Sequence, residues 1–477
     1  MSFGFNMCKD FNIKNLILNV DSYKTSQHNQ LPPNTRSMYG YIEARGPKDA
    51  LVMFFGLQMF IKEYLSTPIT MKDVNEADEF LTVYGAKFNR DAWVYIVESY
   101  GGYLPIKICS LMEGEVVPTG TVLVTIESID SILSDDFNKF LVSYIETALL
   151  RAIWYPSTIA SNDFKAKKTI LHYLNESSDD PLASLRYKLH DFGARGVSSF
   201  ESAGIGGCAH LVNFSGTDTI TGVLYAHKYY NGIPVDKFVP AMEHSTVTAW
   251  GRDDETAAYS NMLDQYAKPG AIVSCVSDSY DLWNAVKNIW GDTLRERVKQ
   301  SGALVVVRPD SQDPIQTPRK VIEILEEKIG YSVNKKGFRV LDPCIRVIQG
   351  DGIENKNIPE IYSNLLDYGH SADNLTLGMG GGKLQKVSRD DYSFAQKNSA
   401  IKIGNKWSDT YKDPIGAPEK KSKRGKFMVL KDKSGWKTMP LDVNDTRNEL
   451  KTVFHVGFSR YDHKMVDIRA RAESYLT

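Results

Sequence analysis

The sequence has 477 residues, which is long enough for two or three domains with sizeable hydrophobic cores. Its 57 basic and 58 acidic residues balance, which argues against a protein that depends on nucleic acid or an anionic membrane surface. With 42% hydrophobic residues, the composition is that of a globular protein and not of a disordered chain.

The cysteines and the N-terminal residues indicate a reducing compartment. The five cysteines form no CxxC pair, which argues against a zinc site or a disulfide framework; they are Cys8, Cys109, Cys208, Cys275 and Cys344. The first residues lack the basic-then-apolar pattern of a signal peptide, and no apolar run is long enough to span a bilayer. We therefore expect a cytoplasmic protein.

The first 180 residues predict a mixture of helices and a small β layer. Apolar residues recur at helical spacing in four segments, and one segment alternates apolar and polar residues with Gly and Pro at its turns. In chain order, we expect helix over 47–66 after Pro47, helix near 72–84 and 90–100, antiparallel strands over 105–128, and a long helical region near 136–176.

The segment from about 185 to 390 repeats one design. Apolar runs such as 303–307 and 345–348 end in polar tips, which recur at roughly the spacing of a βα unit. Runs rich in β-branched residues are typical of strands buried on both faces, and hence of parallel strands. Functional groups at the C-terminal ends of parallel strands predict an irregular β/α barrel with one active-site mouth. An open doubly wound sheet is the alternative.

Three segments follow from this pattern. Residues 1–184 are the N-terminal α+β part of an accessory domain, 185–390 the catalytic barrel, and 391–477 the C-terminal part of the accessory domain. The last segment contains a basic run, 420–426, which reads as a solvated loop. It would suit a polyphosphate only if it folded over the barrel mouth.

The tip at 190–196 carries the most distinctive chemistry. Phe192 offers a stacking face, Arg195 a cation, and Gly193 and Gly196 allow close approach of a ligand to the backbone. A flat heterocycle that carries a phosphate would be held by such a set of groups.

Two later tips are rich in glycine. Residues 380–383 and 350–352 follow strand-like runs, so their backbone N–H groups could face a phosphate; the alternative is a tight βα turn. Neither ends in the GKS or GKT of a P-loop. The glycines of 204–207 do not open after a strand, so a dinucleotide fingerprint is weakly supported.

Charged residues occupy the remaining tips. Asp310 and Asp351 could accept hydrogen bonds from a ribose diol, hold Mg²⁺, or simply cap a helix. Arg308 precedes Pro309 and could donate to an amide oxygen or a phosphate. His244 could be structural, or a nucleophile oriented by a carboxylate.

Taken together, these motifs resemble the nicotinamide phosphoribosyltransferases, which have the type II phosphoribosyltransferase fold. The resemblance implies a homodimer that transfers a phosphoribosyl group from phosphoribosyl pyrophosphate to nicotinamide, with Mg²⁺, and that uses ATP as a co-substrate. It rests on ordered matches at 21–24, 189–193, 216–218, 243–246, 277–281, 308–311, 349–352 and 380–382.

The resemblance also implies the roles of the residues around nicotinamide. Phe192 would stack on one face of the ring, and Tyr23 from a second subunit on the other. Asp218 would accept a hydrogen bond from the carboxamide NH₂, Arg308 would donate to its oxygen, and Arg195 would line the pocket.

By the same resemblance, other residues bind the sugar and the phosphates. Asp310 and Asp351 would hold ribose hydroxyls or the metal-bound diphosphate, the metal being held through that diphosphate with protein ligands unassigned. His244 would be phosphorylated from ATP, and Asp278 belongs to the same catalytic group. Gly350, Gly381 and Gly382 would bind the 5′-phosphate, and Arg45, Arg389 and Lys397 of a second subunit the pyrophosphate.

Two positions depart from the better-known animal members, and three other functions compete. Phe238 and Thr376 stand where smaller side chains are usual along the ligand tunnel. Nicotinate phosphoribosyltransferase shares the fold, but Asp218 would repel a carboxylate substrate. A non-catalytic extracellular signalling protein would neither lack a signal peptide nor retain every catalytic-type residue. The density of matches argues against a phosphate-binding enzyme of unrelated chemistry.

Overall fold

A computed structural model describes residues 11–48, 50–129, 138–232, 238–417, 420–460 and 462–476. The chain divides into two compact units, Met1–Thr158 with Ser388–Tyr475, and Ile159–Val387 with Leu476–Thr477. The sequence-based boundary after residue 184 differs from this division. Residues 159–184 join the second unit because Ile170 and Leu174 are buried in its core.

A seven-stranded antiparallel sheet forms the centre of the first unit, in the order β15–β14–β1–β5–β3–β18–β19. The N-terminal strands β1, β5 and β3 lie at its centre and C-terminal strands flank them on both sides, so both ends of the chain are needed to complete the sheet. The strands are β1 (Thr35–Ala44), β3 (Ile106–Ser110), β5 (Val122–Ser128), β14 (Phe394–Ile403), β15 (Lys406–Asp409), β18 (Lys451–His455) and β19 (Phe458–Ser459).

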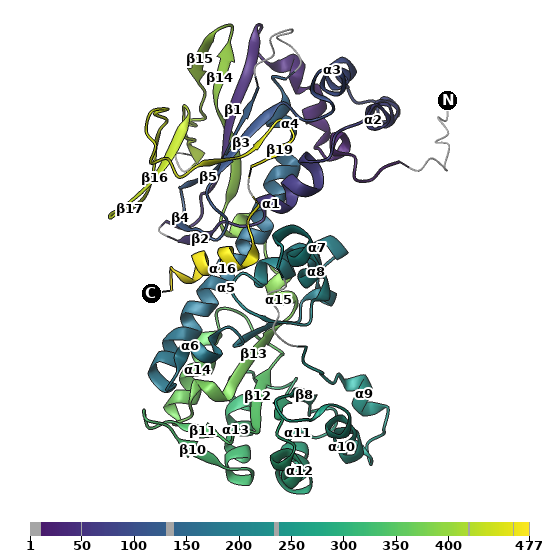
Figure 1. The fold of residues 1–477 in the computed structure, drawn as a ribbon, viewed down its shortest axis with the longest axis vertical. Helices are drawn as coiled ribbons and strands as arrows, with labels where there is room; N and C mark the ends of the chain where they lie inside the picture. Colours follow the sequence, from purple (N-terminus) through teal and green to yellow (C-terminus); the bar gives the residue numbers. More distant parts are fainter. Residues whose placement is uncertain are drawn as a thin grey trace. The chain divides into compact units, whose positions relative to one another are not determined.

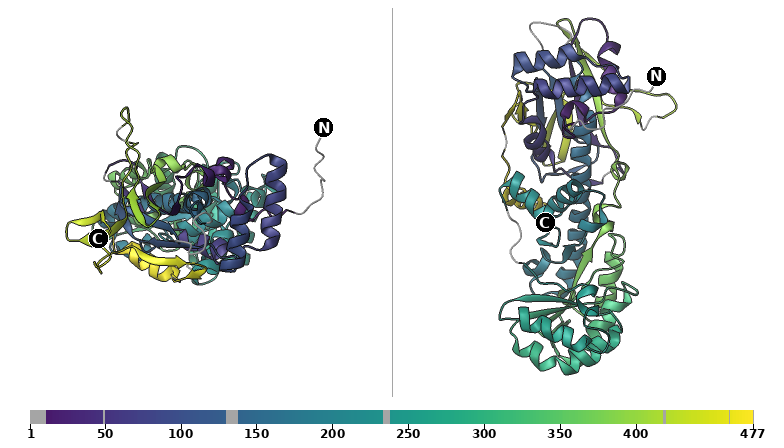
Figure 2. Two further views of the ribbon diagram at one scale, coloured as in Figure 1. Left: turned by 90° about the horizontal axis from the view of Figure 1, so that it is seen from above. Right: turned by 90° about the vertical axis from the view of Figure 1, so that its right-hand side faces the viewer.

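Helices and two smaller strand pairs complete the first unit. α2 and α3 pack side by side, each starting at a side-chain N-cap and ending at a left-handed glycine (Figures 1 and 2). The elements are α1 (Leu57–Phe60), α2 (Met71–Tyr84), α3 (Arg90–Tyr100), α4 (Leu141–Tyr144), the start of α5 (Glu146–Ser177), α16 (Met465–Glu473), and the antiparallel pairs β2 (Leu51–Met53) with β4 (Val116–Pro118) and β16 (Phe427–Asp432) with β17 (Gly435–Pro440).

The predicted helix over 47–66 is wrong in its first half. Residues Leu51–Met53 form β2 because they pair with β4, and the helical turns begin only at Leu57. Helical spacing of apolar residues is a local signal, and here a tertiary strand pairing overrides it. The helices near 72–84 and 90–100 and the antiparallel strands of 105–128 are confirmed. The helical region near 136–176 is α4 followed by α5, and residues 130–137 lie outside the described part.

The basic run 420–426 packs on the first unit through its own ion pairs. Lys423 contacts the buried Glu43, and Lys426 lies 2.9 Å from Glu127. These charges are therefore already balanced by acidic residues of β1 and β5, which leaves them less able to bind a polyphosphate.

The first unit also contains a buried, uncharged histidine, His463. Its side chain is 7% exposed, and burial together with the nearby Arg471 lowers its pKa to about 4. In the unfolded chain it takes up a proton near the ordinary value of 6.5. Between these two values only the unfolded chain binds the proton, so the free energy of unfolding should decrease by about 1–3 kcal/mol as the pH falls.

Replacing His463 with Gln should remove this part of the acid sensitivity. The backbone bonds of this residue to Gln58, 2.7 and 2.9 Å long, do not involve the imidazole and should persist. We expect melting temperatures measured from about pH 7 down to about pH 4 to fall less steeply for His463→Gln than for wild type. His455→Gln on β18 is the control. Identical acid dependence in wild type and His463→Gln would contradict the assignment.

Six parallel strands form the sheet of the second unit, in the order β7–β6–β13–β12–β9–β8. Three of them, β8, β12 and β13, are labelled in Figure 1. Neighbouring strands follow one another in the chain, and the last strand, β13, lies beside the first, β6. A bridge from Ala241 to Ser274 extends the sheet beyond β8. The strands are β6 (Leu189–Asp191), β7 (Gly216–Thr217), β8 (Ile272–Val276), β9 (Leu304–Arg308), β12 (Ile345–Gln349) and β13 (Leu375–Met379).

This strand order confirms the irregular β/α barrel and excludes the open doubly wound sheet, in which the first and last strands are separated. Val305 and Val347 are fully buried, as expected for strands covered on both faces. The connecting helices are α6 (Pro181–Leu185), α7 (Phe200–His210), α8 (Ile220–Tyr230), α9 (His244–Thr248), α10 (Glu255–Tyr266), α11 (Leu282–Asn284), α12 (Arg295–Gln300), α13 (Gln316–Lys328), α14 (Ile358–Asp367) and α15 (Gly381–Leu384), and β10 (Tyr331–Val333) pairs with β11 (Arg339–Leu341) outside the barrel.

Two further findings limit the kinds of site in this chain. The glycines of 204–207 lie within α7, where a Cβ at Gly207 would come 2.9 Å from the Cα of Gly222 on α8. They therefore permit close helix packing and do not form a dinucleotide-binding turn. Of the helices in the described parts of the chain, none has both the length and the hydropathy needed to cross a bilayer.

Candidate active site

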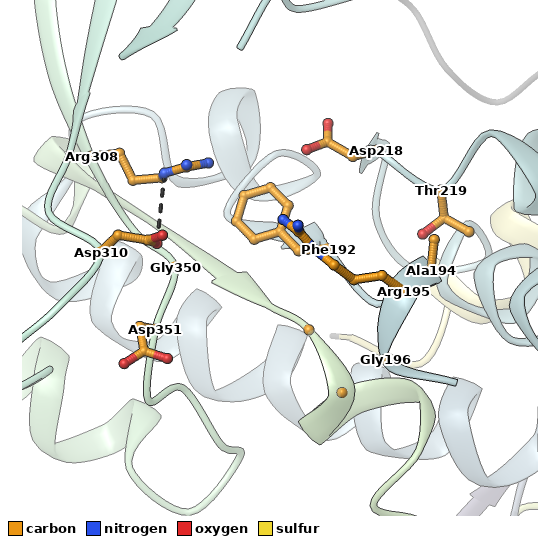
Figure 3. Close-up of a pocket in the computed structure, with 12 residues that line it drawn as sticks. Phe192, Ala194, Arg195, Gly196, Asp218, Thr219, Arg308, Asp310, Gly350 and Asp351 are labelled. Atoms are coloured by element: carbon orange, nitrogen blue, oxygen red, sulfur yellow. Dashed lines mark ion pairs between the residues drawn. The ribbon is translucent and has the colours of Figure 1, made fainter. Parts of the chain in front are cut away.

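The polar tips of the second unit meet at the C-terminal ends of its strands and enclose a pocket of about 420 Å³. β6, β9, β12 and β13 each end immediately before one part of its lining. The lining residues are Phe192, Ala194, Arg195, Gly196, Asp218, Thr219, Arg308, Asp310, Gly350, Asp351, Gly380 and Gly381 (Figure 3). Most of the residues expected from the sequence to bind the ring, the ribose and the 5′-phosphate are thus brought together.

The Phe192 ring packs against the backbone of two glycines, Gly378 and Gly350. A Cβ at Gly378 would lie 2.0 Å from its Cε2 atom, and one at Gly350 would lie 3.2 Å from the same atom. The Phe192 N–H donates to the carbonyl of Met379 over 3.0 Å, which ties the tip of β6 to β13. The ring can therefore approach the sheet only because residue 378 has no side chain.

A methyl group at Gly378 should displace Phe192 from this position. We expect Gly378→Ala to raise the KM for the ring substrate by about tenfold or more, because the substrate loses its stacking partner. Gly416→Ala is the control, since a Cβ there would meet no atom within 4 Å. Steady-state kinetics of the two variants test the expectation, and an unchanged KM in Gly378→Ala would show that the ring substrate does not stack on Phe192.

Arg308 and Asp218 lie on either side of the Phe192 ring (Figure 3). The Arg308 guanidinium carbon is 5.9 Å from the ring centroid, and its Nη2 donates to the carbonyl of Met242 over 3.1 Å. Asp218 is half-exposed, and its Oδ1 lies 3.1 Å from the Nε2 of His190. The pocket therefore presents a planar cationic donor and a carboxylate acceptor to whatever stacks on Phe192.

A cluster of one histidine and two carboxylates lies at the edge of this pocket. The Nε2 atom of His244 is 3.5 Å from Asp310 Oδ2 and 3.7 Å from Asp278 Oδ1. Asp278 is 4% exposed, and its Oδ1 accepts no hydrogen bond from the described residues. The backbone N–H of Asp310 donates to Asp278 Oδ2 over 3.1 Å, and His244 Nδ1 lies 3.1 Å from the Ser279 hydroxyl.

Glu243 is not the carboxylate partner of His244. It contacts the hydroxyl of Ser245 and lies 3.9 Å from the exposed guanidinium of Arg195. The acidic partners, Asp278 and Asp310, follow the ends of β8 and β9, which are distant from His244 in the sequence. Arg308 Nε, 3.6 Å from Asp310 Oδ1, connects this cluster to the pocket.

The glycine turns line a second, adjoining pocket of about 480 Å³. Gly381 and Gly382 open α15 there, so their N–H groups are at a helix start. A buried ion pair, which the sequence did not predict, anchors this turn to α5. Lys383 contacts Asp163, which also lies 2.6 Å from His210 Nδ1.

Charge complementarity stabilises this buried group. Burial alone raises the pKa of Asp163, but Lys383 and His210 more than offset it, so the pKa lies below its ordinary value. His210 Nε2 in turn lies 2.9 Å from the carbonyl of Gly216, next to the tip that carries Asp218. The glycine turn and the Asp218 tip are thus joined through one buried network.

The remaining predicted residues belong to the first unit. Burial lowers the pKa of Lys397, and Arg45, Lys412 and Arg389 lower it further although the nearby Glu146 acts in the opposite direction. Arg45 and Arg389 thus both lie close enough to Lys397 to act on it electrostatically. Tyr23 is 61% exposed, with its hydroxyl 3.5 Å from Asp21 Oδ2.

Three other expectations concern the pocket rim and the metal. Phe238 is exposed and Thr376 half-buried, and neither lines the two pockets. Within the described residues, no group of three or more His, Cys, Asp or Glu side chains could hold a metal ion. Asp310 and Asp351 both line the first pocket and fit a metal ion that is bound mainly through a substrate diphosphate, as Mg²⁺ commonly is.

Sequence comparison assigns both parts of the chain. A sequence model of the nicotinate phosphoribosyltransferase family matches residues 187–458, and the N-terminal domain model of nicotinamide phosphoribosyltransferase matches residues 15–108. The nicotinamide phosphoribosyltransferase of Xanthomonas campestris is 45% identical over 470 residues, covering 97% of this chain and 99% of the relative.

The chain belongs to the nicotinamide phosphoribosyltransferase family. The nicotinamide phosphoribosyltransferase of Mycoplasma pneumoniae is 31% identical and covers 86% of this chain and 95% of its own length. Two solved structures share the fold. They are nicotinate-nucleotide pyrophosphorylase from Pyrococcus furiosus, with a TM-score of 0.61, 15% identity and coverage of 98% and 97%, and human nicotinic acid phosphoribosyltransferase, with 0.54, 13%, 96% and 93%.

Proposed function

We propose that this protein transfers the phosphoribosyl group of phosphoribosyl pyrophosphate to nicotinamide, giving nicotinamide mononucleotide and pyrophosphate in NAD salvage. The observation that carries the proposal is the placement of Asp218 and Arg308 around the Phe192 ring. A primary amide needs one acceptor for its NH₂ group and one donor for its oxygen, and these two side chains supply them. Membership of the family supports the same reaction.

The residues of the pocket act mainly by positioning the substrates. Phe192 stacks on the pyridine ring, so that its nitrogen faces the anomeric carbon of the sugar. Asp310 and Asp351 accept hydrogen bonds from ribose hydroxyls, and the N–H groups at Gly381 and Gly382 bind the 5′-phosphate at a helix start. Attack by a pyridine nitrogen releases no proton, so the transfer needs no general base.

Negative charge grows on the departing pyrophosphate. Asp310 and Asp351 would hold Mg²⁺ together with the substrate diphosphate, and a bound Mg²⁺ neutralises part of that charge. We assign the rest of this task to Arg45, Arg389 and Lys397, whose proximity in the first unit supports joint action. In this proposal they come from a second subunit of a homodimer, together with Tyr23, which stacks on the free face of the ring.

The acceptor is the point on which the proposal differs from its nearest rival. A nicotinate phosphoribosyltransferase would place a substrate carboxylate beside Asp218, where two negative charges repel. The test supplies either nicotinamide or nicotinate with phosphoribosyl pyrophosphate and Mg²⁺, and identifies the nucleotide by chromatography and mass spectrometry. Nicotinamide mononucleotide that appears only when phosphoribosyl pyrophosphate is present supports the proposal. Formation of nicotinate mononucleotide alone, or of no nucleotide, would refute it.

We further propose that ATP stimulates the reaction by phosphorylating His244. The two carboxylates facing Nε2 favour the tautomer that carries its proton there, which leaves the Nδ1 lone pair as the nucleophile. A phosphate on this residue would add negative charge beside the pyrophosphate site. It would thereby change how strongly Arg45, Arg389 and Lys397 bind the pyrophosphate. The cytoplasm is the compartment we propose, because Cys109, Cys275 and Cys344 are free thiols and Cys275 is buried.

His244→Ala should abolish ATP hydrolysis and acid-labile labelling, yet leave slower synthesis without ATP. The reason is that the transfer itself uses no base, whereas phosphate transfer needs the imidazole. The measurement is label transfer from γ-labelled ATP, run beside nucleotide formation without ATP. His227→Ala on α8 is the matched control. Label that persists on His244→Ala would remove this residue from the role.

A further inference from the structure

His190 contacts both residues that define the ring site but has no role in the reaction described above. Its Nε2 lies 3.1 Å from Asp218 Oδ1, and its ring centroid is 5.0 Å from that of Phe192. Its side chain is 17% exposed, against 48% for Asp218. A largely buried imidazole is therefore placed against a more exposed carboxylate at the acceptor end of the pocket.

The backbone around His190 leaves its ring little freedom. A Cβ at Gly216 on β7 would lie 2.5 Å from the His190 Nδ1 atom, so the ring occupies space that only a glycine leaves open. The other strand beside it, β13, presents Gly378 in register with His190. The imidazole is thus held between Gly216 and the Phe192 ring, with its Nε2 directed to Asp218.

Few charged groups surround this imidazole in the described structure. Asp218 follows β7, and β13 offers only Gly378 at this level. On the strand of His190 itself, the buried Asp191 already accepts a hydrogen bond from the N–H of Gly193 over 2.8 Å. Beyond the Phe192 ring lies Arg308, which donates to Met242. Asp218 is therefore the charged partner of His190.

We propose that His190 is a positioning and specificity-determining residue, which orients Asp218 and sets the net charge that an incoming pyridine substrate meets. This inference rests on the proposed function of the pocket. A neutral His190 donates Nε2–H to Asp218 Oδ1, holding the carboxylate while its second oxygen receives the amide NH₂. The pair then carries one negative charge, which repels nicotinate.

Protonation of His190 changes this discrimination. The imidazolium and the carboxylate together carry no net charge, so a substrate carboxylate meets less repulsion. Nicotinate keeps its own charge when an imidazole takes up a proton, because carboxyl groups ionise at lower pH. Preference for nicotinamide should therefore be stronger with a neutral His190 than with a protonated one.

Two substitutions separate orientation from charge. His190→Phe keeps an aromatic ring beside Phe192 but removes the donor to Asp218. His190→Gln keeps a donor at the reach of Nε2 but cannot take up a proton. The measurements are the KM for nicotinamide, the KM for phosphoribosyl pyrophosphate, and the inhibition constant of nicotinate against nicotinamide, at about pH 6 and about pH 8. Thermal unfolding shows whether each variant is folded.

In His190→Phe the KM for nicotinamide should rise about tenfold while that for phosphoribosyl pyrophosphate stays unchanged, as expected for the loss of one hydrogen bond to a charged group. In His190→Gln the KM for nicotinamide should stay near the wild-type value. Nicotinate should inhibit the wild type severalfold more strongly at the lower pH. It should inhibit His190→Gln equally at both pH values. Wild-type KM in His190→Phe, or the wild-type pH response in His190→Gln, would overturn the inference. Wild-type protein that forms no nicotinamide mononucleotide would instead refute the proposed function.

Discussion

Asp218→Asn should lose about 1.5–3 kcal/mol of transition-state binding for nicotinamide and become more tolerant of nicotinate. The first effect arises because an amide oxygen accepts a weaker hydrogen bond from the substrate NH₂ than a carboxylate does. The second arises because the charge that repels nicotinate is gone. The measurement is kcat/KM for each substrate at saturating phosphoribosyl pyrophosphate.

The control for Asp218 is Asp253→Asn, which removes the same charge from an exposed loop position of the same unit. This control variant should leave kcat/KM unchanged for both nicotinamide and nicotinate. If the wild-type enzyme already turns over nicotinate as well as nicotinamide, Asp218 does not set substrate choice, whatever the variant does.

Two inactive variants should restore activity to each other when mixed. Tyr23→Ala and Asp218→Ala are each expected to be nearly inactive, because one removes a stacking face and the other the amide acceptor. If each site takes Tyr23 from a second subunit, half of a random mixture is mixed dimers, and each mixed dimer holds one intact site. Activity should therefore recover to about one quarter of the wild-type value.

Subunit exchange has to be demonstrated before this mixture is assayed, for example by mass spectrometry of differently tagged chains. A mixture of Asp218→Ala with Asp310→Ala serves as the control, because both residues line the pocket of a single subunit. That mixture should stay inactive, since no mixed dimer regains a complete site. Exchange without recovery in the first mixture would mean that the active site is complete within one subunit.

The barrel and its polar tips could be predicted from the sequence because their signals are local. A run such as 304–308 is apolar and β-branched, and the residue type changes abruptly where the strand ends. Parallel strands place all such ends on one edge, so separate motifs converge without any knowledge of their contacts. Phe192, Arg308 and Asp351 could be assigned to one pocket for this reason.

The contacts within the site could not be predicted in the same way. Lys383 meets Asp163 across 220 positions of sequence, and His210 meets it across 47. Nothing local marks such a pair, because each residue alone reads as an ordinary polar side chain of a helix. Adjacency in the sequence is no guide either, because Glu243 directly precedes His244 while Asp278 and Asp310 are the carboxylates that face its imidazole.

The segment over 47–66 shows how local reading fails in the fold itself. Its apolar spacing indicated a helix from Pro47, but Val52 and Met53 pair with β4 instead. Strand formation depends on a partner that lies more than sixty residues further along, which a helical pattern does not reveal.

The most direct test of the account is a crystal structure of the protein with nicotinamide mononucleotide. We expect the pyridine ring against Phe192, its carboxamide NH₂ within hydrogen-bond reach of Asp218 and its oxygen near Arg308. The phosphate should lie at the N–H groups of Gly381 and Gly382, and Tyr23 of a second subunit on the free face of the ring. A nucleotide bound away from the strand ends of the second unit, or a carboxamide directed away from Asp218, would contradict the central claim.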